Sequence, residues 1–175
     1  MSGAPSETGL VLPVPEIDDF VQRWRPYDAV PLSGVPAHIT VLFPWIPPPV
    51  PDADLERLAD LTRDFEPFEF ELTEVRWFGT DVVFIAPEPA GPFVELTRAV
   101  AAAWPEYPPY EGEFDDPIPH LTLVHGGASE VMARAGEQAV ELLPIRCRAE
   151  QLWLMVGGWN PAVWSIDRRY RLGGR

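Results

Sequence analysis

Two short segments of the sequence each place a histidine two residues before a threonine. The first pair is His38 and Thr40, and the second is His120 and Thr122. Both segments are rich in β-branched and aliphatic residues, which predicts strands, and residues two apart in a strand share a face. Each segment therefore presents an imidazole and a hydroxyl side by side on a stiff element.

This combination of side chains suits the cleavage of a phosphodiester. The reaction needs a base to take a proton from the attacking water and an acid to give one to the leaving oxygen, and histidine, with a reference pKa of about 6.5, serves in either role. Threonine hydroxyls donate hydrogen bonds to phosphate oxygens as negative charge gathers on them. We predict metal-independent acid/base catalysis by His38 and His120, assisted by Thr40 and Thr122, with no cofactor. The base and the acid stay unassigned.

Four further residues are predicted to contact the substrate. Phe43 and Tyr110 carry rings that can stack on a base, although strict alternation along residues 38–43 would turn Phe43 toward the core. Arg76 and Arg148 are the predicted cations for a phosphate group, because basic residues are scarce in this chain.

The remaining histidine of the sequence is His125. It follows His120 by an odd number of residues, which turns its side chain to the opposite face of a continuous strand. Gly126 and Gly127 come next and predict a turn. We therefore predict no catalytic role for His125. The histidine spacing contains no cluster with a carboxylate that suits zinc, so we predict no metal site.

The hydrophobic spacing predicts two similar runs of strands and helices around these segments. This pattern indicates an α/β fold of the α+β type with a pseudo-twofold, duplicated arrangement of two lobes, at about 9–77 and 81–171, within one domain over 1–175. The first run has strands at 9–14, 38–43 and 68–77, a helix at 16–25, and a helix capped by Asp52. The second run has strands at 81–86, 119–124, 145–156 and 161–171, a helix opened by Pro92, and a helix capped by Ser129.

The composition narrows the class of protein. A chain of 175 residues with 46% hydrophobic residues can bury the core of one domain, which we expect to be a monomer. A single cysteine, Cys147, excludes internal disulfides and multi-cysteine zinc sites. The N-terminus lacks the pattern of a signal peptide, and no segment is suited to a membrane helix. We therefore expect a cytoplasmic protein.

The formal net charge is −14, with 27 acidic and 13 basic residues. Proteins that bind long nucleic acid normally present a basic face to its phosphates. The acidic run at residues 111–116 lies in the loop before the second motif and repels a polyanion further. We therefore predict a nucleotide or short RNA as the substrate, no long nucleic acid and no membrane partner.

Residues 37–44 (AHITVLFP) and 119–124 (PHLTLV) resemble the paired signatures of the 2H phosphoesterase superfamily, in particular bacterial 2',5' RNA ligases or RNA 2',3'-cyclic phosphodiesterases. The resemblance extends to the loop at 107–119 (YPPYEGEFDDPIP), to WLMV at 153–156 and to YRLG at 170–173. It implies two antiparallel sheets that face a central cleft, with the helices outside. It also implies that His38, Thr40, His120 and Thr122 act on a 2',3'-cyclic or 2',5' phosphodiester, in the direction of hydrolysis or ligation.

Two other functions remain open at this point. The same pocket could serve a nucleotide-binding sensor module, although intact histidines and threonines in both motifs argue against that role. The fold could also have been recruited to acid/base chemistry that does not involve phosphate.

Overall fold

The computed structural model describes residues 3–113 and 116–174. Phe114 and Asp115 of the predicted acidic run lie outside the described residues. The strands are β1 (Glu7–Pro13), β2 (His38–Leu42), β3 (Phe68–Phe78), β4 (Val82–Glu88), β5 (Leu121–His125), β6 (Ile145–Ala149), β7 (Gln151–Gly157) and β8 (Trp164–Arg171). The helices are η1 (Pro15–Ile17), α1 (Asp18–Trp24), η2 (Arg25–Tyr27), α2 (Asp52–Arg63), α3 (Gly91–Ala103), η3 (Pro109–Gly112) and α4 (Ser129–Val140), where η marks a short 3-10 turn.

The strands form two four-stranded antiparallel sheets, which confirms the predicted fold class. One sheet has the order β2-β1-β7-β8 and the other has the order β5-β4-β3-β6. The strand that carries the threonine of each motif, β2 or β5, therefore lies at the edge of its sheet, and these two strands contact each other. This contact brings the two motifs to the junction of the sheets.

The sheets do not follow the predicted division at 9–77 and 81–171. Strand β3 pairs with β4 in the second sheet, whereas β7 and β8 complete the first sheet beside β1. The segment 145–156, predicted as one strand, is interrupted at Glu150, so that β6 pairs with β3 and β7 pairs with β1. The buried positions change phase at the break, from Cys147 and Ala149 before it to Leu152 and Leu154 after it, as expected where the chain changes sheet.

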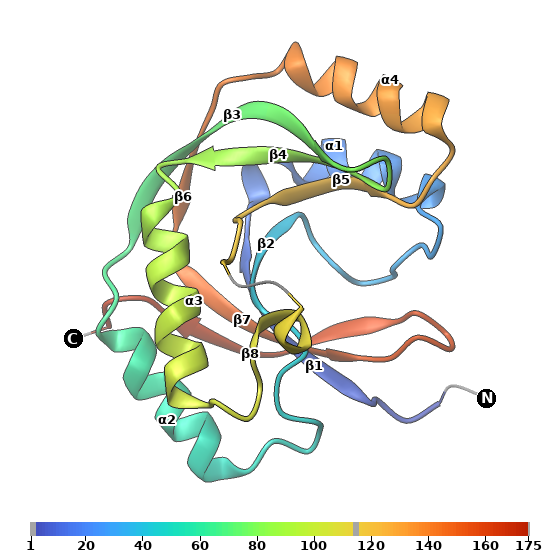
Figure 1. Cartoon of the computed structure of the whole chain (residues 1–175). Coiled ribbons are helices and arrows are strands. Elements are labelled where there is room, and N and C mark those ends of the chain that lie inside the picture. Colours follow the sequence, from blue (N-terminus) through green and yellow to red (C-terminus); the bar gives the residue numbers. More distant parts are fainter. Residues whose placement is uncertain (1–2, 114–115, 175) are drawn as a thin grey trace.

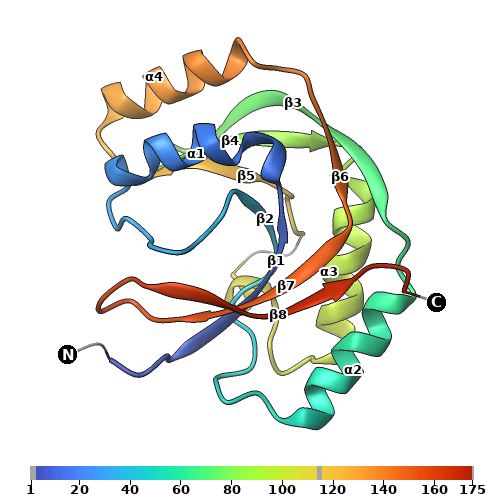
Figure 2. The same cartoon turned by 180° about the vertical axis from the view of Figure 1, so that it is seen from behind.

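The helices lie on the outer faces of the sheets (Figures 1 and 2). Helices α1 and α4 contact strands of the β5-β4-β3-β6 sheet, and α3 and α2 contact β2 and β8 of the other sheet. Helix α3 buries Phe93, Leu96 and Val100 at the helical spacing that the sequence predicts. Asp52 and Ser129 are the first residues of α2 and α4 and not their caps, and no side chain caps either start.

With the outer faces covered by helices, the inner faces of the two sheets are left to face one another. Among the described residues no helix is long and apolar enough to cross a membrane.

Candidate active site

A β-bulge follows the first motif. His38 and Thr40 share one side of β2, while Ile39 is buried on the other. Val11 pairs with Thr40 and Leu10 pairs with Leu42, so Val41 has no partner in β1. Val41 and Leu42 are consecutive buried residues, which resets the alternation and turns Phe43 to the same side as Thr40. Phe43 therefore lines the cavity between the sheets together with Thr40, and its expected turn toward the core is wrong.

The second motif has the same bulge. Phe84 pairs with Thr122 and Val83 pairs with Val124, which leaves Leu123 unpaired. Leu123 and Val124 are both buried, so His125 emerges on the side of Thr122 and lines the same cavity. The prediction that His125 faces away from the site was wrong, because it assumed a continuous strand. The two adjacent apolar residues were the available sign of a bulge.

The two histidines are oriented in the same way. Nδ1 of His38 lies 2.8 Å from the carbonyl oxygen of Pro36, and Nδ1 of His120 lies 2.7 Å from that of Ile118. A carbonyl oxygen only accepts hydrogen bonds, so Nδ1 of each ring carries the proton. Nε2 of each ring is then the atom left for proton transfer. His38 begins β2, whereas His120 directly precedes β5.

Tyr110 joins the two motifs. Its hydroxyl is hydrogen-bonded to the side chain of Thr40, and its ring stacks on His120 with 6.4 Å between the ring centroids. Its backbone N–H donates to the carbonyl oxygen of Phe43 at 2.8 Å. Tyr110 holds this position with a φ of 50°, in the left-handed region that a non-glycine residue rarely adopts. The predicted contact residue Tyr110 therefore lies at the site.

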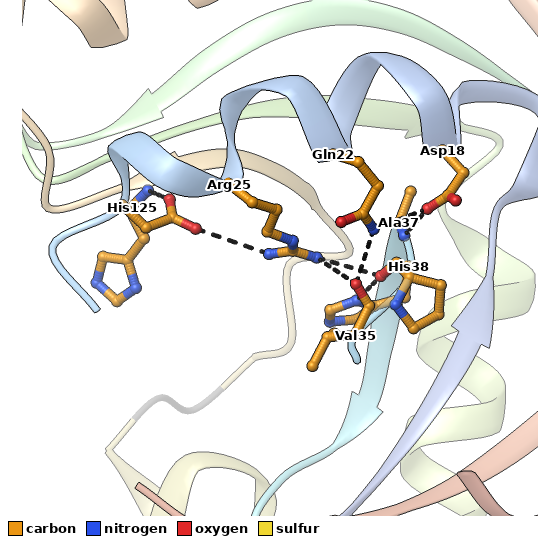
Figure 3. Close-up of polar contacts among 9 residues, drawn as sticks. Asp18, Gln22, Arg25, Val35, Ala37, His38 and His125 are labelled. Carbon is orange, nitrogen blue, oxygen red and sulfur yellow. Dashed lines mark hydrogen bonds and ion pairs between the residues drawn. The ribbon is translucent and has the colours of Figure 1, made fainter. Parts of the chain in front are cut away.

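The segment before His38 is fastened to α1 by side chains that sequence analysis did not single out (Figure 3). Asp18 Oδ1 accepts the N–H of Ala37 at 2.7 Å, and Gln22 Nε2 donates to the carbonyl of Val35 at 2.9 Å. Arg25 Nη2 donates to the carbonyls of Val35 and Pro36, at 3.3 and 3.2 Å. The Pro36 carbonyl therefore accepts from both Arg25 and the His38 ring. Asp18, Gln22 and Arg25 follow one another at spacings of four and three residues, so they share one face of α1 and of the turn η2 that continues it.

Arg25 and Asp28 form a buried ion pair at the cavity wall. Their charged atoms lie 3.8 Å apart, and Asp28 Oδ1 also accepts the backbone N–H of His125 at 2.8 Å. Burial raises the pKa of Asp28 and lowers the pKa of Arg25, and the attraction between the two charges opposes both changes. This pair connects the segment before the first motif to the end of the second.

Burial lowers the pKa of both motif histidines. The pKa of His38 falls from 6.5 to about 4, chiefly by desolvation, with smaller effects from the charges of Arg25 and His120. The hydrogen bond to Pro36 acts in the opposite direction. Desolvation also lowers the pKa of His120, and the charge of His125 adds to that effect. The effect of His120 on His38 indicates that the two rings lie within electrostatic range of each other.

A cavity of about 510 Å³ lies between the sheets and is lined by residues of both. Its polar side includes His38, Thr40, Thr122 and His125. His120 lies beside it, with its ring centroid 5.0 Å from that of Phe78 and 5.6 Å from that of Phe84. Imidazole groups and hydroxyl donors therefore line one cavity.

The two predicted cations lie outside the cavity. Arg76 is exposed on β3 and pairs with Glu74, and Arg148 is exposed on β6 and pairs with Glu150. Neither residue lines the cavity, whereas Arg25 does. Among the described residues no group of three His, Cys, Asp or Glu side chains is arranged to hold a metal ion.

Comparison with known proteins identifies related sequences and folds. The model of the 2'-5' RNA ligase superfamily matches residues 13–158. Escherichia coli LigT with 3'-AMP is 17% identical over 97% of this chain and 99% of LigT, with a TM-score of 0.61. The protein TT0787 of Thermus thermophilus is 18% identical over the same shares, also with a TM-score of 0.61.

A third solved structure, described only as a phosphoesterase, is 16% identical, with 97% of this chain and 99% of that one covered and a TM-score of 0.57. No curated protein matches the chain. At these identities the solved structures establish the fold.

Proposed function

The chain belongs to the 2'-5' RNA ligase superfamily, and we propose that it hydrolyses 2',3'-cyclic or 2',5'-linked nucleotide phosphodiesters by two-histidine acid/base catalysis. The matched imidazoles carry this proposal. Each holds Nδ1–H on the carbonyl two residues earlier, which leaves Nε2 for proton transfer. Each also lies two residues before a threonine that lines the cavity.

In the proposed reaction one neutral imidazole takes a proton from water as the water oxygen forms a bond to phosphorus. The bond from phosphorus to one ribose oxygen breaks, and the second imidazole, in its protonated form, gives its proton to that oxygen. The product is a phosphomonoester beside a free hydroxyl. If the 5'-hydroxyl of a second nucleotide takes the place of water, its oxygen forms the new bond to phosphorus, the bond to the 3' oxygen breaks, and that oxygen takes the proton. The product then carries a 2',5' linkage.

The surroundings of the histidines fit this scheme. Both pKa values are lowered in the free protein, which favours the neutral form that a base requires. A bound phosphodiester carries a negative charge that raises the pKa of a nearby imidazole and so favours the protonated acid. The Thr40 and Thr122 hydroxyls can donate to phosphate oxygens as charge develops there. No metal is required for any of these steps.

A small nucleotide is the proposed substrate. E. coli LigT has been solved with 3'-AMP, NADP+ and ATP, so a protein of this fold binds nucleotides. The net charge of −14 disfavours a long polyanion. Among the described residues that line the cavity, Arg25 is the arginine. It already pairs with Asp28 and donates hydrogen bonds to two backbone carbonyls.

The test is a hydrolysis panel with the purified protein in the presence of EDTA. It would contain 2',3'-cyclic mononucleotides, a 2',5'-linked dinucleotide and an oligoribonucleotide that ends in a cyclic phosphate. We expect turnover of the small substrates, no gain with added Mg²⁺ or Zn²⁺, and a lower kcat/KM for the oligomer. Loss of activity in EDTA would contradict the metal-independent mechanism, and nucleotide binding without turnover would favour a sensor module.

A further inference from the structure

The β7–β8 hairpin closes one side of the cavity with rings that the proposed chemistry does not use. Trp159 and Trp164 of the hairpin meet Phe43 at the end of β2, and all three line the cavity. The ring centroids lie 5.6 Å apart for Trp159 and Trp164, 6.2 Å for Phe43 and Trp159, and 5.9 Å for Phe43 and Trp164. We call these three residues the aromatic wall.

Backbone packing holds the aromatic wall in place. A Cβ at Gly157 would overlap the Trp164 ring, and one at Gly9 would lie 3.0 Å from the Phe43 ring. The two rings therefore lie directly on neighbouring backbone. The loop before β2 is also bonded to the hairpin, because Ser33 N–H donates to Ala162 O at 2.9 Å and Trp164 N–H donates to Ser33 O at 2.8 Å.

Trp159 is the accessible member of the wall. Its side chain is 47% exposed, yet its indole N–H donates to Glu7 Oε2 at 2.7 Å. An exposed ring that is already held in one orientation loses little conformational freedom when a ligand packs on it. Trp159 therefore offers a preorganised flat surface at the cavity.

The cavity lining as a whole combines two kinds of group. His38, Thr40 and Thr122 line it together with the aromatic wall and with apolar residues that include Val11 and Met155. A ligand that matches this lining combines a phosphoryl group with a flat apolar group. Nucleobases meet the second requirement, since they stack on aromatic side chains with little dependence on sequence.

We propose that the aromatic wall is a subsite for the nucleobase of the substrate, an inference that rests on the proposed phosphodiesterase function for the position of the phosphate. The wall selects nucleotides over phosphodiesters that lack a base. It acts on substrate binding and takes no part in proton transfer.

The test compares Trp159→Ala with Trp77→Ala by calorimetric titration of the whole protein. Trp77 is a matched control, because it is 41% exposed on β3 and does not line the cavity. We expect Trp159→Ala to weaken binding of 3'-AMP about tenfold. Inorganic phosphate should bind equally to the wild type and to both variants, and Trp77→Ala should bind 3'-AMP like the wild type.

A second variant guards against loss of the fold. Glu7→Ala keeps the ring of Trp159 but frees its indole, and we expect it to weaken 3'-AMP binding about threefold. Unchanged 3'-AMP affinity in Trp159→Ala would overturn the subsite, as would a parallel loss of phosphate affinity. Tighter wild-type binding of octyl phosphate than of 3'-AMP would also overturn it, because the wall would then be a site for aliphatic groups.

The readout is binding, so it is separate from the proposed activity. A protein that binds 3'-AMP through Trp159 but hydrolyses neither 2',3'-cyclic nor 2',5'-linked nucleotides would contradict the proposed function and leave the nucleobase subsite standing.

Discussion

The segments that carry His38 and His120 have the same backbone plan. In both, Nδ1 donates to the carbonyl of the residue two positions earlier, and a bulge follows the threonine. In both, the fifth residue after the histidine lines the cavity, as Phe43 in one segment and His125 in the other. The similarity reaches the hydrogen-bond pattern and the register, well beyond the His-x-Thr letters.

Their surroundings differ. The Pro36 carbonyl that orients His38 also accepts from buried Arg25, and the charge of Arg25 helps to lower the pKa of His38. The ring of His120 instead packs near the rings of Phe78, Phe84 and Tyr110. The two segments share a geometry but differ in their electrostatic surroundings. Their histidines can therefore differ in proton affinity, and acid/base catalysis depends on that difference.

The largest expected effect is on stability and comes from Arg25, which contacts the segment before His38. Arg25→Met leaves Asp28 buried without its cation and should lower the free energy of unfolding by about 3 kcal/mol. The matched control is Arg63→Met. The ion pair of Arg63 with Asp60 is exposed, so its loss should change the free energy of unfolding by less than about 1 kcal/mol. Denaturant unfolding measures both changes. Equal stability of the two variants would show that the Arg25 pair does not support the first segment.

The next effect distinguishes the general acid from the general base. A nucleoside phosphodiester with a p-nitrophenolate leaving group needs no general acid, so the alanine variant that lacks the acid should recover at least about a hundredfold relative to its loss on a cyclic nucleotide. The variant that lacks the base should stay impaired on both substrates. We therefore expect one of His38→Ala and His120→Ala to recover and the other not. Recovery of both, or of neither, would argue against distinct roles.

A smaller effect concerns stability against pH. The pKa of His38 is about 4 in the folded protein and 6.5 by default, so the unfolded chain binds more protons between these values. The contribution of neutral His38 to stability is complete above pH 6.5 and is lost as pH falls through 4. The loss between pH 7 and pH 4.5 amounts to about 2 kcal/mol. Denaturant unfolding at both pH values should show a drop in stability that is about 2 kcal/mol smaller in His38→Gln. An equal drop in wild type and variant would contradict the burial of a neutral His38.

Periodicity and motif spacing predicted much of this fold from the sequence. Alternation located the strands around both motifs, and apolar residues at helical spacing located α3. The motif letters named His38, Thr40 and Thr122, which the structure brings to one cavity, and His120, which it brings beside that cavity. These features depend on neighbours in the chain, which is the information that a local pattern contains.

Other features depend on contacts between distant residues. The bulges at Val41 and Leu123 are defined by pairing with β1 and β4, and the first is supported by Thr97, whose hydroxyl donates to the Val41 carbonyl at 2.8 Å. Arg25 reaches the site because α1 packs beside the segment before His38, and no local pattern marks it as a cavity residue. The change of sheet at Glu150 likewise follows from pairing with β3 and then β1.

The most direct test of the central claim, that the two motifs form one site, is a double-mutant cycle on a 2',3'-cyclic mononucleotide. The measured quantity is kcat for the wild type, His38→Ala, His120→Ala and the double variant, each checked for folding by circular dichroism. We expect each single variant to lose at least about a hundredfold, and the double variant to fall within a few-fold of the weaker single, because groups that act as one unit are not additive. Wild-type kcat in either single variant, or losses that multiply in the double variant, would contradict a shared site.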